Sequence, residues 1–95
     1  DMFGFVDLAA DLGFDAVEPT SYWFPPGADA GYLRRLQQHA FLQGLDVSGT
    51  AIRNDFCLPP GERREADLAA VRRGIDQAAA LSAPTVRVFG GTVPE

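Results

Sequence analysis

Hydrophobic residues follow a helical period in three stretches of the chain, separated by short apolar runs. The residues on these stripes are Phe5, Leu8, Ala9 and Leu12; Leu33, Leu36 and Ala40; and Leu68, Val71, Ile75, Ala78 and Ala79. Spacing of i, i+3, i+4 and i+7 is typical of an amphipathic helix with one buried face. The pattern therefore predicts three helices, and we expect these residues to be buried.

Three β-rich segments follow the three predicted helical stripes, at 14–18, 46–52 and 85–89. Gly13 and Gly44 stand where the first two helices should end, and Asp29 is a candidate N-cap for the second helix. Strands that alternate with long helices are typical of right-handed βαβ units with a parallel sheet. The sequence thus predicts an α/β fold.

The ends of the three predicted strands recur at a regular distance. Glu18, Arg53 and Phe89 lie 35 and 36 residues apart, about one βα unit of an eight-stranded (β/α)8 barrel. Such a barrel has roughly 250 residues, so residues 1–95 are expected to form a partial TIM barrel, truncated at both ends. A complete small domain with a flavodoxin-like open sheet is the alternative.

Composition narrows the classes of partner. The net charge is −5, which argues against a nucleic-acid backbone as partner because that surface needs a basic face. All eight basic residues are arginine, so this stretch holds no Schiff-base lysine. One cysteine allows no internal disulfide, which favours a cytoplasmic protein. No apolar run reaches the length of a membrane span.

In (β/α)8 barrels the chemistry lies where strands end and βα loops begin. Glu18 ends the first predicted strand, and its carboxylate could act as a general base, bind sugar hydroxyls or orient another side chain. A structural ion pair with Arg53 or Arg87 is the alternative. Arg87 lies within an apolar strand, so it needs a partner, and we favour a structural role for it.

Two further candidates lie at the ends of the second and third predicted strands. Asn54 can donate to and accept from a hydroxyl group, and it is the preferred site residue of the run 53–55. Gly90 begins a Gly-Gly pair that lets the backbone approach a ligand closely. No GxGxxG or P-loop motif occurs, so dinucleotide and P-loop functions have no support.

An aromatic run, Tyr22-Trp23-Phe24, follows the first strand. Trp23 is a candidate to pack on the apolar face of a sugar; packing on the next helix, or a subunit contact in a homo-oligomer, is the alternative. His39 is predicted to be a helix surface or packing residue. Cys57 is interpreted as a packing thiol.

Two segments, 5–18 with its Gly-Phe-Asp-Ala-Val-Glu ending and 80–91 with Val-Arg-Val-Phe-Gly-Gly, resemble the xylose isomerase-like TIM barrels, the superfamily of sugar phosphate isomerases and epimerases. The resemblance implies that the chain runs from the first helix through the fourth strand. It implies a sugar or sugar-phosphate substrate and proton transfer next to a carbonyl. It also implies a divalent cation (Mn, Mg, Co or Zn) whose ligands lie beyond residue 95.

On this resemblance, the segment supplies the substrate-binding wall, with Glu18, Trp23, Asn54 and Gly90 as site residues. No residue is assigned a catalytic or metal-binding role, and the segment alone is expected to be inactive. A metal-dependent lyase or dehydratase, or a non-catalytic sugar-binding barrel, is the alternative. The apurinic-site endonucleases place metal-binding histidines where this chain has 53–54 and 89–90, so that function is disfavoured.

Overall fold

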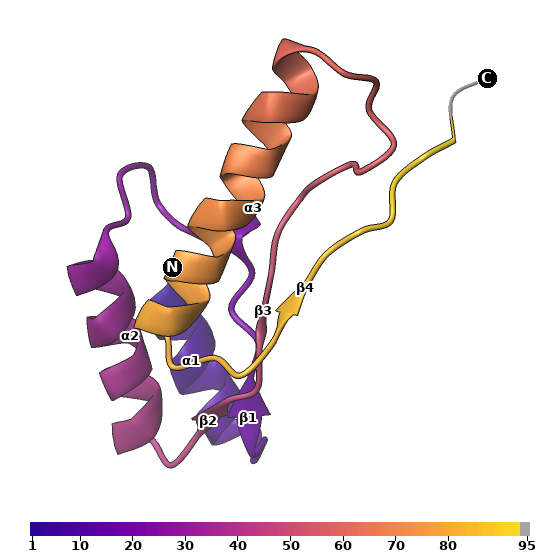
Figure 1. Cartoon of the computed structure of the whole chain (residues 1–95). Coiled ribbons are helices and arrows are strands. Elements are labelled where there is room, and N and C mark those ends of the chain that lie inside the picture. The colour runs from indigo at the N-terminus through magenta and orange to yellow at the C-terminus, as the bar shows by residue number, and fades with distance from the viewer. Residues whose placement is uncertain (94–95) are drawn as a thin grey trace.

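The computed structural model describes residues 1–93, in which helices and short parallel strands alternate (Figure 1). The elements are α1 (Met2–Asp11), β1 (Ala16–Val17), the 3₁₀ helix η1 (Ser21–Trp23), α2 (Ala30–Leu42), β2 (Asp46–Val47), β3 (Thr50–Ala51), α3 (Glu62–Ala80) and β4 (Val86–Arg87). The α/β class and the three helices are as predicted. The regular strands are shorter than the predicted segments.

The sheet is built around the middle segment, 46–51. β2 pairs in parallel with β1, β3 pairs in parallel with β4, and a bridge joins Thr20 to Ala51. Val17 pairs with Val47, and the next pair is Thr20 with Ala51. Between these two pairs the middle segment has one residue more than the first strand. This extra residue has the character of a β-bulge. Pro19 has no N–H to donate there, which explains why the ladder is interrupted.

Aspartates begin the first two helices. Asp1 accepts a hydrogen bond from the backbone N–H of Gly4 at 2.7 Å, and Asp29 accepts one from that of Tyr32 at 2.8 Å. Each carboxylate satisfies a donor that a helix start leaves free and lies at the positive end of the helix dipole. The predicted N-cap at Asp29 is confirmed.

The buried face of α2 is confirmed, because Leu33, Leu36 and Ala40 are all at most 2% exposed. The predicted face of α1 is wrong except for Ala9. The buried residues are Met2, Val6 and Ala9, whereas the other three side chains expected inside are open. Their exposed fractions are 44% for Phe5, 56% for Leu8 and 65% for Leu12. α1 is apolar around most of its circumference, so the sequence pattern could not select the face that packs.

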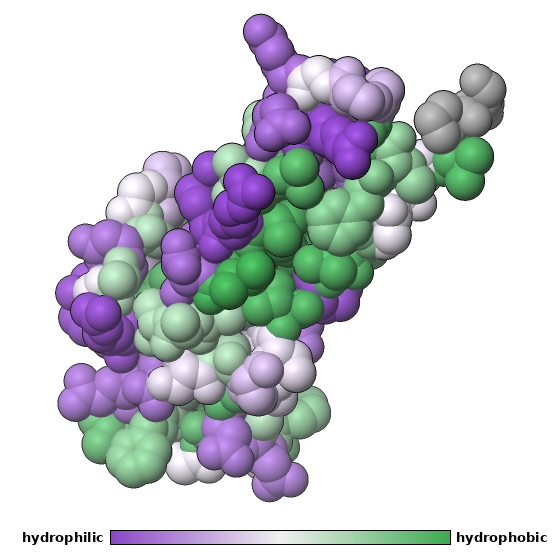
Figure 2. Space-filling model, in the orientation of Figure 1, coloured by the Kyte–Doolittle hydropathy of each residue, from purple (hydrophilic) through white to green (hydrophobic). Residues whose placement is uncertain are grey.

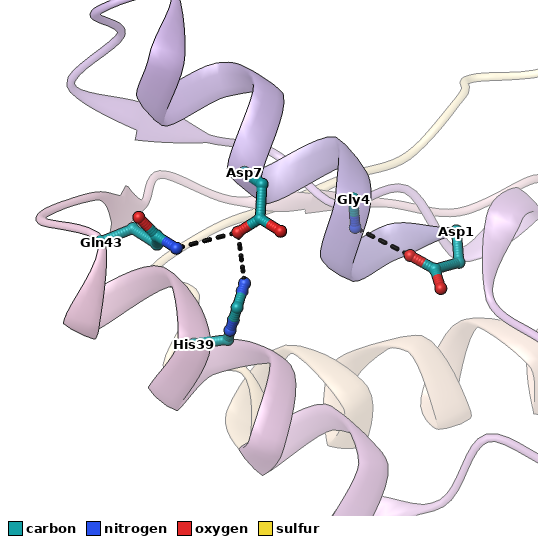
Figure 3. A network of polar contacts seen from close by, with 5 residues as sticks. All are labelled: Asp1, Gly4, Asp7, His39 and Gln43. Carbon is teal, nitrogen blue, oxygen red and sulfur yellow. Dashed lines mark hydrogen bonds and ion pairs between the residues drawn. The ribbon is translucent and has the colours of Figure 1, made fainter.

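A polar network also joins α1 to α2 (Figure 3). Asp7 Oδ1 accepts a hydrogen bond from Gln43 Nε2 at 2.8 Å and lies 2.6 Å from His39 Nε2. The His39 ring packs edge-on to Phe3, with centroids 5.3 Å apart. The prediction of a packing role for His39 is confirmed, and the network fixes how the two helices lie together.

Phe3 also packs edge-on to Tyr32, with ring centroids 5.6 Å apart. Burial raises the pKa of the Tyr32 hydroxyl above its usual 10.0, and the nearby charge of Arg35 acts in the opposite direction. Phe3 therefore contacts two rings of α2, which explains why this side of α1 faces its neighbour.

The third helix packs through small residues. Its buried positions are Gly74 and Ala78, followed by Leu81 at the helix end. Burial of Ala78 was predicted. Ile75, which is 55% exposed, and Ala79, which is also exposed, were wrongly predicted to be buried. A methyl group built on Gly74 would overlap the side chain of Ile52. The helix therefore approaches the middle segment more closely than a larger residue would allow. Apolar surface gathers alongside α3 on the face in Figure 2, with hydrophilic surface around it.

We predict that Gly74→Ala lowers the free energy of unfolding by about 1–3 kcal/mol, because overpacking in a tight contact is costly. Helix propensity alone predicts the opposite sign, since alanine is favoured over glycine by about 1 kcal/mol. Urea unfolding of the chain measures the difference. Gly31→Ala on α2 is the control, because its nearest atoms are side-chain atoms at 3.3 and 3.4 Å. A Gly74→Ala variant as stable as the parent would contradict the close approach.

Candidate functional site

A hollow of about 500 Å³ lies where β1 ends and α1 begins. It is lined by Asp1, Met2 and Phe5 of the α1 end and by Glu18, Thr20 and Trp23. The structure thus brings together two of the four predicted substrate-binding residues, Glu18 and Trp23. Sequence reasoning missed Phe5 as a lining residue because its helical spacing assigned it to the core.

Glu18 is exposed in this hollow. The ion pair with Arg53 or Arg87 that was considered for it does not form: within residues 1–93 the only salt bridge joins His39 to Asp7. The backbone beside Glu18 is crowded, because a methyl group on Gly49 would lie 2.6 Å from Thr85 Oγ1 and 3.6 Å from Glu18 Oε2. The carboxylate therefore lies near a tightly packed strand pair and is open to a ligand.

The three aromatic residues of the loop have three different environments. Phe24 packs against the hydrophobic core, whereas the Trp23 side chain is 74% exposed. The Tyr22 hydroxyl donates to the backbone carbonyl of Ile52 at 3.2 Å. Phe24 therefore packs inside the protein, Tyr22 contacts the strand ends, not the next helix, and the exposed Trp23 is left available.

Arg87 contacts aromatic rings in place of a carboxylate. Its Nη2 donates to the Tyr22 hydroxyl at 3.2 Å, and its Cζ lies 3.9 Å from the centroid of the Phe89 ring. The Tyr22 ring also lies 5.4 Å from Arg53 Cζ and 5.9 Å from Arg87 Cζ. These are cation–π distances, so the positive charge of both arginines is placed around one tyrosine.

Asn54 is buried, with 6% of its surface exposed, and both ends of its amide bond the backbone of one residue. Nδ2 donates to the Phe89 carbonyl at 2.8 Å, and Oδ1 accepts from the Phe89 N–H at 2.7 Å. The side chain therefore joins the ends of two neighbouring strands. A direct contact of Asn54 with substrate stays a prediction.

Gly90 is exposed, with open space where a side chain would be. The next residue is more constrained: Gly91 has φ +119°, and a methyl group there would overlap the carboxylate of Asp55. Asp55 Oδ1 accepts from the N–H of Cys57 at 2.8 Å. The N–H of Thr92 donates to the same oxygen at 3.3 Å, so the turn is bonded to the loop after β3. The role of Gly90 in substrate binding stays a prediction.

Within residues 1–93, no group of three or more His, Cys, Asp or Glu side chains is arranged to hold a metal ion. The described residues therefore do not fit the divalent cation that the resemblance implies. In the same part of the chain, no helix has the length and apolar character needed to cross a membrane.

Parallel strands joined by helical crossovers are the architecture of part of a (β/α)8 barrel. The sequence profile of the xylose isomerase-like TIM barrel family matches residues 6–95, and the chain belongs to this family. The family includes sugar isomerases and epimerases as well as endonucleases. No curated protein sequence matches the chain.

We predict that Asn54→Ala lowers the free energy of unfolding by about 1–3 kcal/mol, the usual cost of leaving a buried group unpaired. The Phe89 amide should also exchange its hydrogen faster, which NMR hydrogen exchange measures directly. Gln38→Ala, which truncates an exposed amide on α2, is the control. Unchanged exchange at Phe89 would show that the amide does not join the two strand ends.

Proposed function

We propose that this chain forms the substrate-binding wall of a barrel enzyme that isomerises or epimerises a sugar or sugar phosphate by proton transfer next to a carbonyl. The observation that carries the proposal is the hollow of about 500 Å³ at the carboxyl end of β1, where an exposed carboxylate and an exposed indole meet. The family to which the chain belongs includes such enzymes.

The two side chains suit the two kinds of surface that a sugar presents. The Trp23 indole is a flat apolar body on which the C–H face of a sugar packs. The Glu18 carboxylate accepts hydrogen bonds from hydroxyl groups, and bonds to a charged acceptor are stronger than neutral ones. Together they bind and orient the sugar at the rim where the barrel carries out its chemistry.

The divalent cation proposed for the barrel would be held by residues outside 1–93. When bound, such an ion polarises a carbonyl oxygen as a Lewis acid. The contribution of this chain is the positioning of the sugar, which we assign to Glu18 and Trp23.

We predict that Glu18→Gln weakens ketose binding about tenfold, because a charged acceptor contributes about 1.5–3 kcal/mol per hydrogen bond. Trp23 is the only tryptophan of the chain, so a fructose titration followed by tryptophan fluorescence reports on the hollow itself. Glu65→Gln, an exposed acid on α3, is the matched control. Equal affinities for the parent and the Glu18→Gln variant would remove Glu18 from the site.

The activity itself is tested on the complete barrel that contains this chain, because the segment alone is expected to be inactive. The barrel is incubated with ketoses and ketose phosphates, before and after chelation and with Mn, Mg, Co or Zn restored. We expect epimerised or isomerised product that disappears on chelation and returns with one of the four ions. Release of water or carbon–carbon cleavage would instead identify a dehydratase or lyase. Absence of any turnover of these substrates would contradict the proposed function.

A further inference from the structure

A second, smaller hollow of about 210 Å³ lies between η1, the end of β3 and α3. Its lining residues are Ser21, Ile52, Arg53, Ala70, Arg73 and Gln77. Four of these six side chains are hydrogen-bond donors and none is acidic. η1 contributes to both hollows: Trp23 lines the larger one and Ser21 lines the smaller one.

Among residues 1–93, the two guanidinium groups of this hollow have no carboxylate partner. Arg53 and Arg73 are both exposed, and the one salt bridge within residues 1–93 involves neither of them. The chain carries a net charge of −5, so acids are plentiful elsewhere on it. Two like charges at one hollow repel each other, and an anion placed between them relieves that repulsion and is attracted by both.

Arg53 lies beside Tyr22, whose own contacts hold it to two strand ends. Arg53 Cζ lies 5.4 Å from the centroid of the Tyr22 ring, and the Tyr22 hydroxyl is bonded to the Ile52 carbonyl and to Arg87. Arg73 comes from α3, which is seated closely on Ile52 through Gly74. The donors therefore start from ordered elements, which lowers the entropy cost of binding.

We propose that this hollow binds the phosphate group of a phosphate monoester. The guanidinium groups of Arg53 and Arg73 supply charge-assisted hydrogen bonds, and the Ser21 hydroxyl and the Gln77 amide supply neutral ones. Donors from three separate elements surround the hollow, which suits the tetrahedral oxygens of phosphate better than a planar carboxylate. This site would hold the phosphate of the sugar phosphate in the proposed function. It rests on that function, which supplies the sugar that carries the phosphate.

Isothermal titration of the chain with inorganic phosphate, at fixed chloride concentration, tests the site directly. Replacing Arg73 or Arg53 by glutamine should weaken phosphate binding about tenfold or more, the usual effect of losing one charge-assisted contact. Arg72→Gln is the matched control, because Arg72 is the exposed neighbour of Arg73 on α3 and does not line the hollow. We expect it to change the affinity less than about twofold.

Equal effects of Arg72→Gln and Arg73→Gln, or no heat of phosphate binding with the parent chain, would overturn the site. Fructose 6-phosphate distinguishes substrate phosphate from free phosphate. We expect it to bind more tightly than phosphate or fructose and to change Trp23 fluorescence; affinity no higher than that of phosphate would overturn the assignment to substrate. If fructose binding depends on Glu18 but phosphate does not bind, the phosphate site is wrong and the proposed function still stands.

Discussion

Parallel pairing of the middle segment, 46–51, with strands on both sides is the constraint on which the rest of the structure depends. The pairing is irregular where Pro19 lacks a donor, and its carbonyl is satisfied by a side chain: the buried Thr50 hydroxyl donates to it at 2.6 Å. Gly49 leaves room for Thr85 on the other side. Because all three strands run in the same direction, their carboxyl ends meet at one edge, and both hollows lie there.

The residue that follows this segment, Ile52, determines where α3 lies. Ile52 is buried against Gly74, so α3 is drawn onto the middle segment and its neighbouring residues Arg73 and Gln77 reach the rim. Asp67, nearer the start of α3, accepts a hydrogen bond from the backbone N–H of Asp55 at 2.7 Å. Two contacts thus act together: the apolar one between Ile52 and Gly74, and the polar one between Asp55 and Asp67. They keep the loop after β3 in place although only part of it is buried.

The predictable parts of the fold are those encoded by local sequence. The Asp29 cap, the α2 face and the alternation of strand and helix depend on residues a few positions apart, and all three could be predicted. The packing face of α1 could not, because apolar residues occur on several of its sides and only contact with α2 selects one. The bond between Asn54 and Phe89, the Asp7–His39 contact and the aromatic partners of Arg87 join residues 32 to 65 positions apart. No local pattern encodes such pairs. Glu18 was chosen for its position at a strand end and Trp23 for its place in the aromatic run, and both line the larger hollow. The hollow on the other side of η1 depends on α3 and carries no sequence motif.

Tyr22 connects the rim to the sheet, and this bears on how rigid the site is. Its hydroxyl donates to the carbonyl of Ile52 and accepts from Arg87, so one side chain of the short helix η1 contacts both neighbouring strand ends. Loops are usually the mobile part of a barrel rim, but here both the residue before Tyr22 and the residue after it line a hollow. Movement of η1 would therefore change both hollows at once and would break contacts with two strands. The strand pairing and the two hollows are therefore connected through this one side chain.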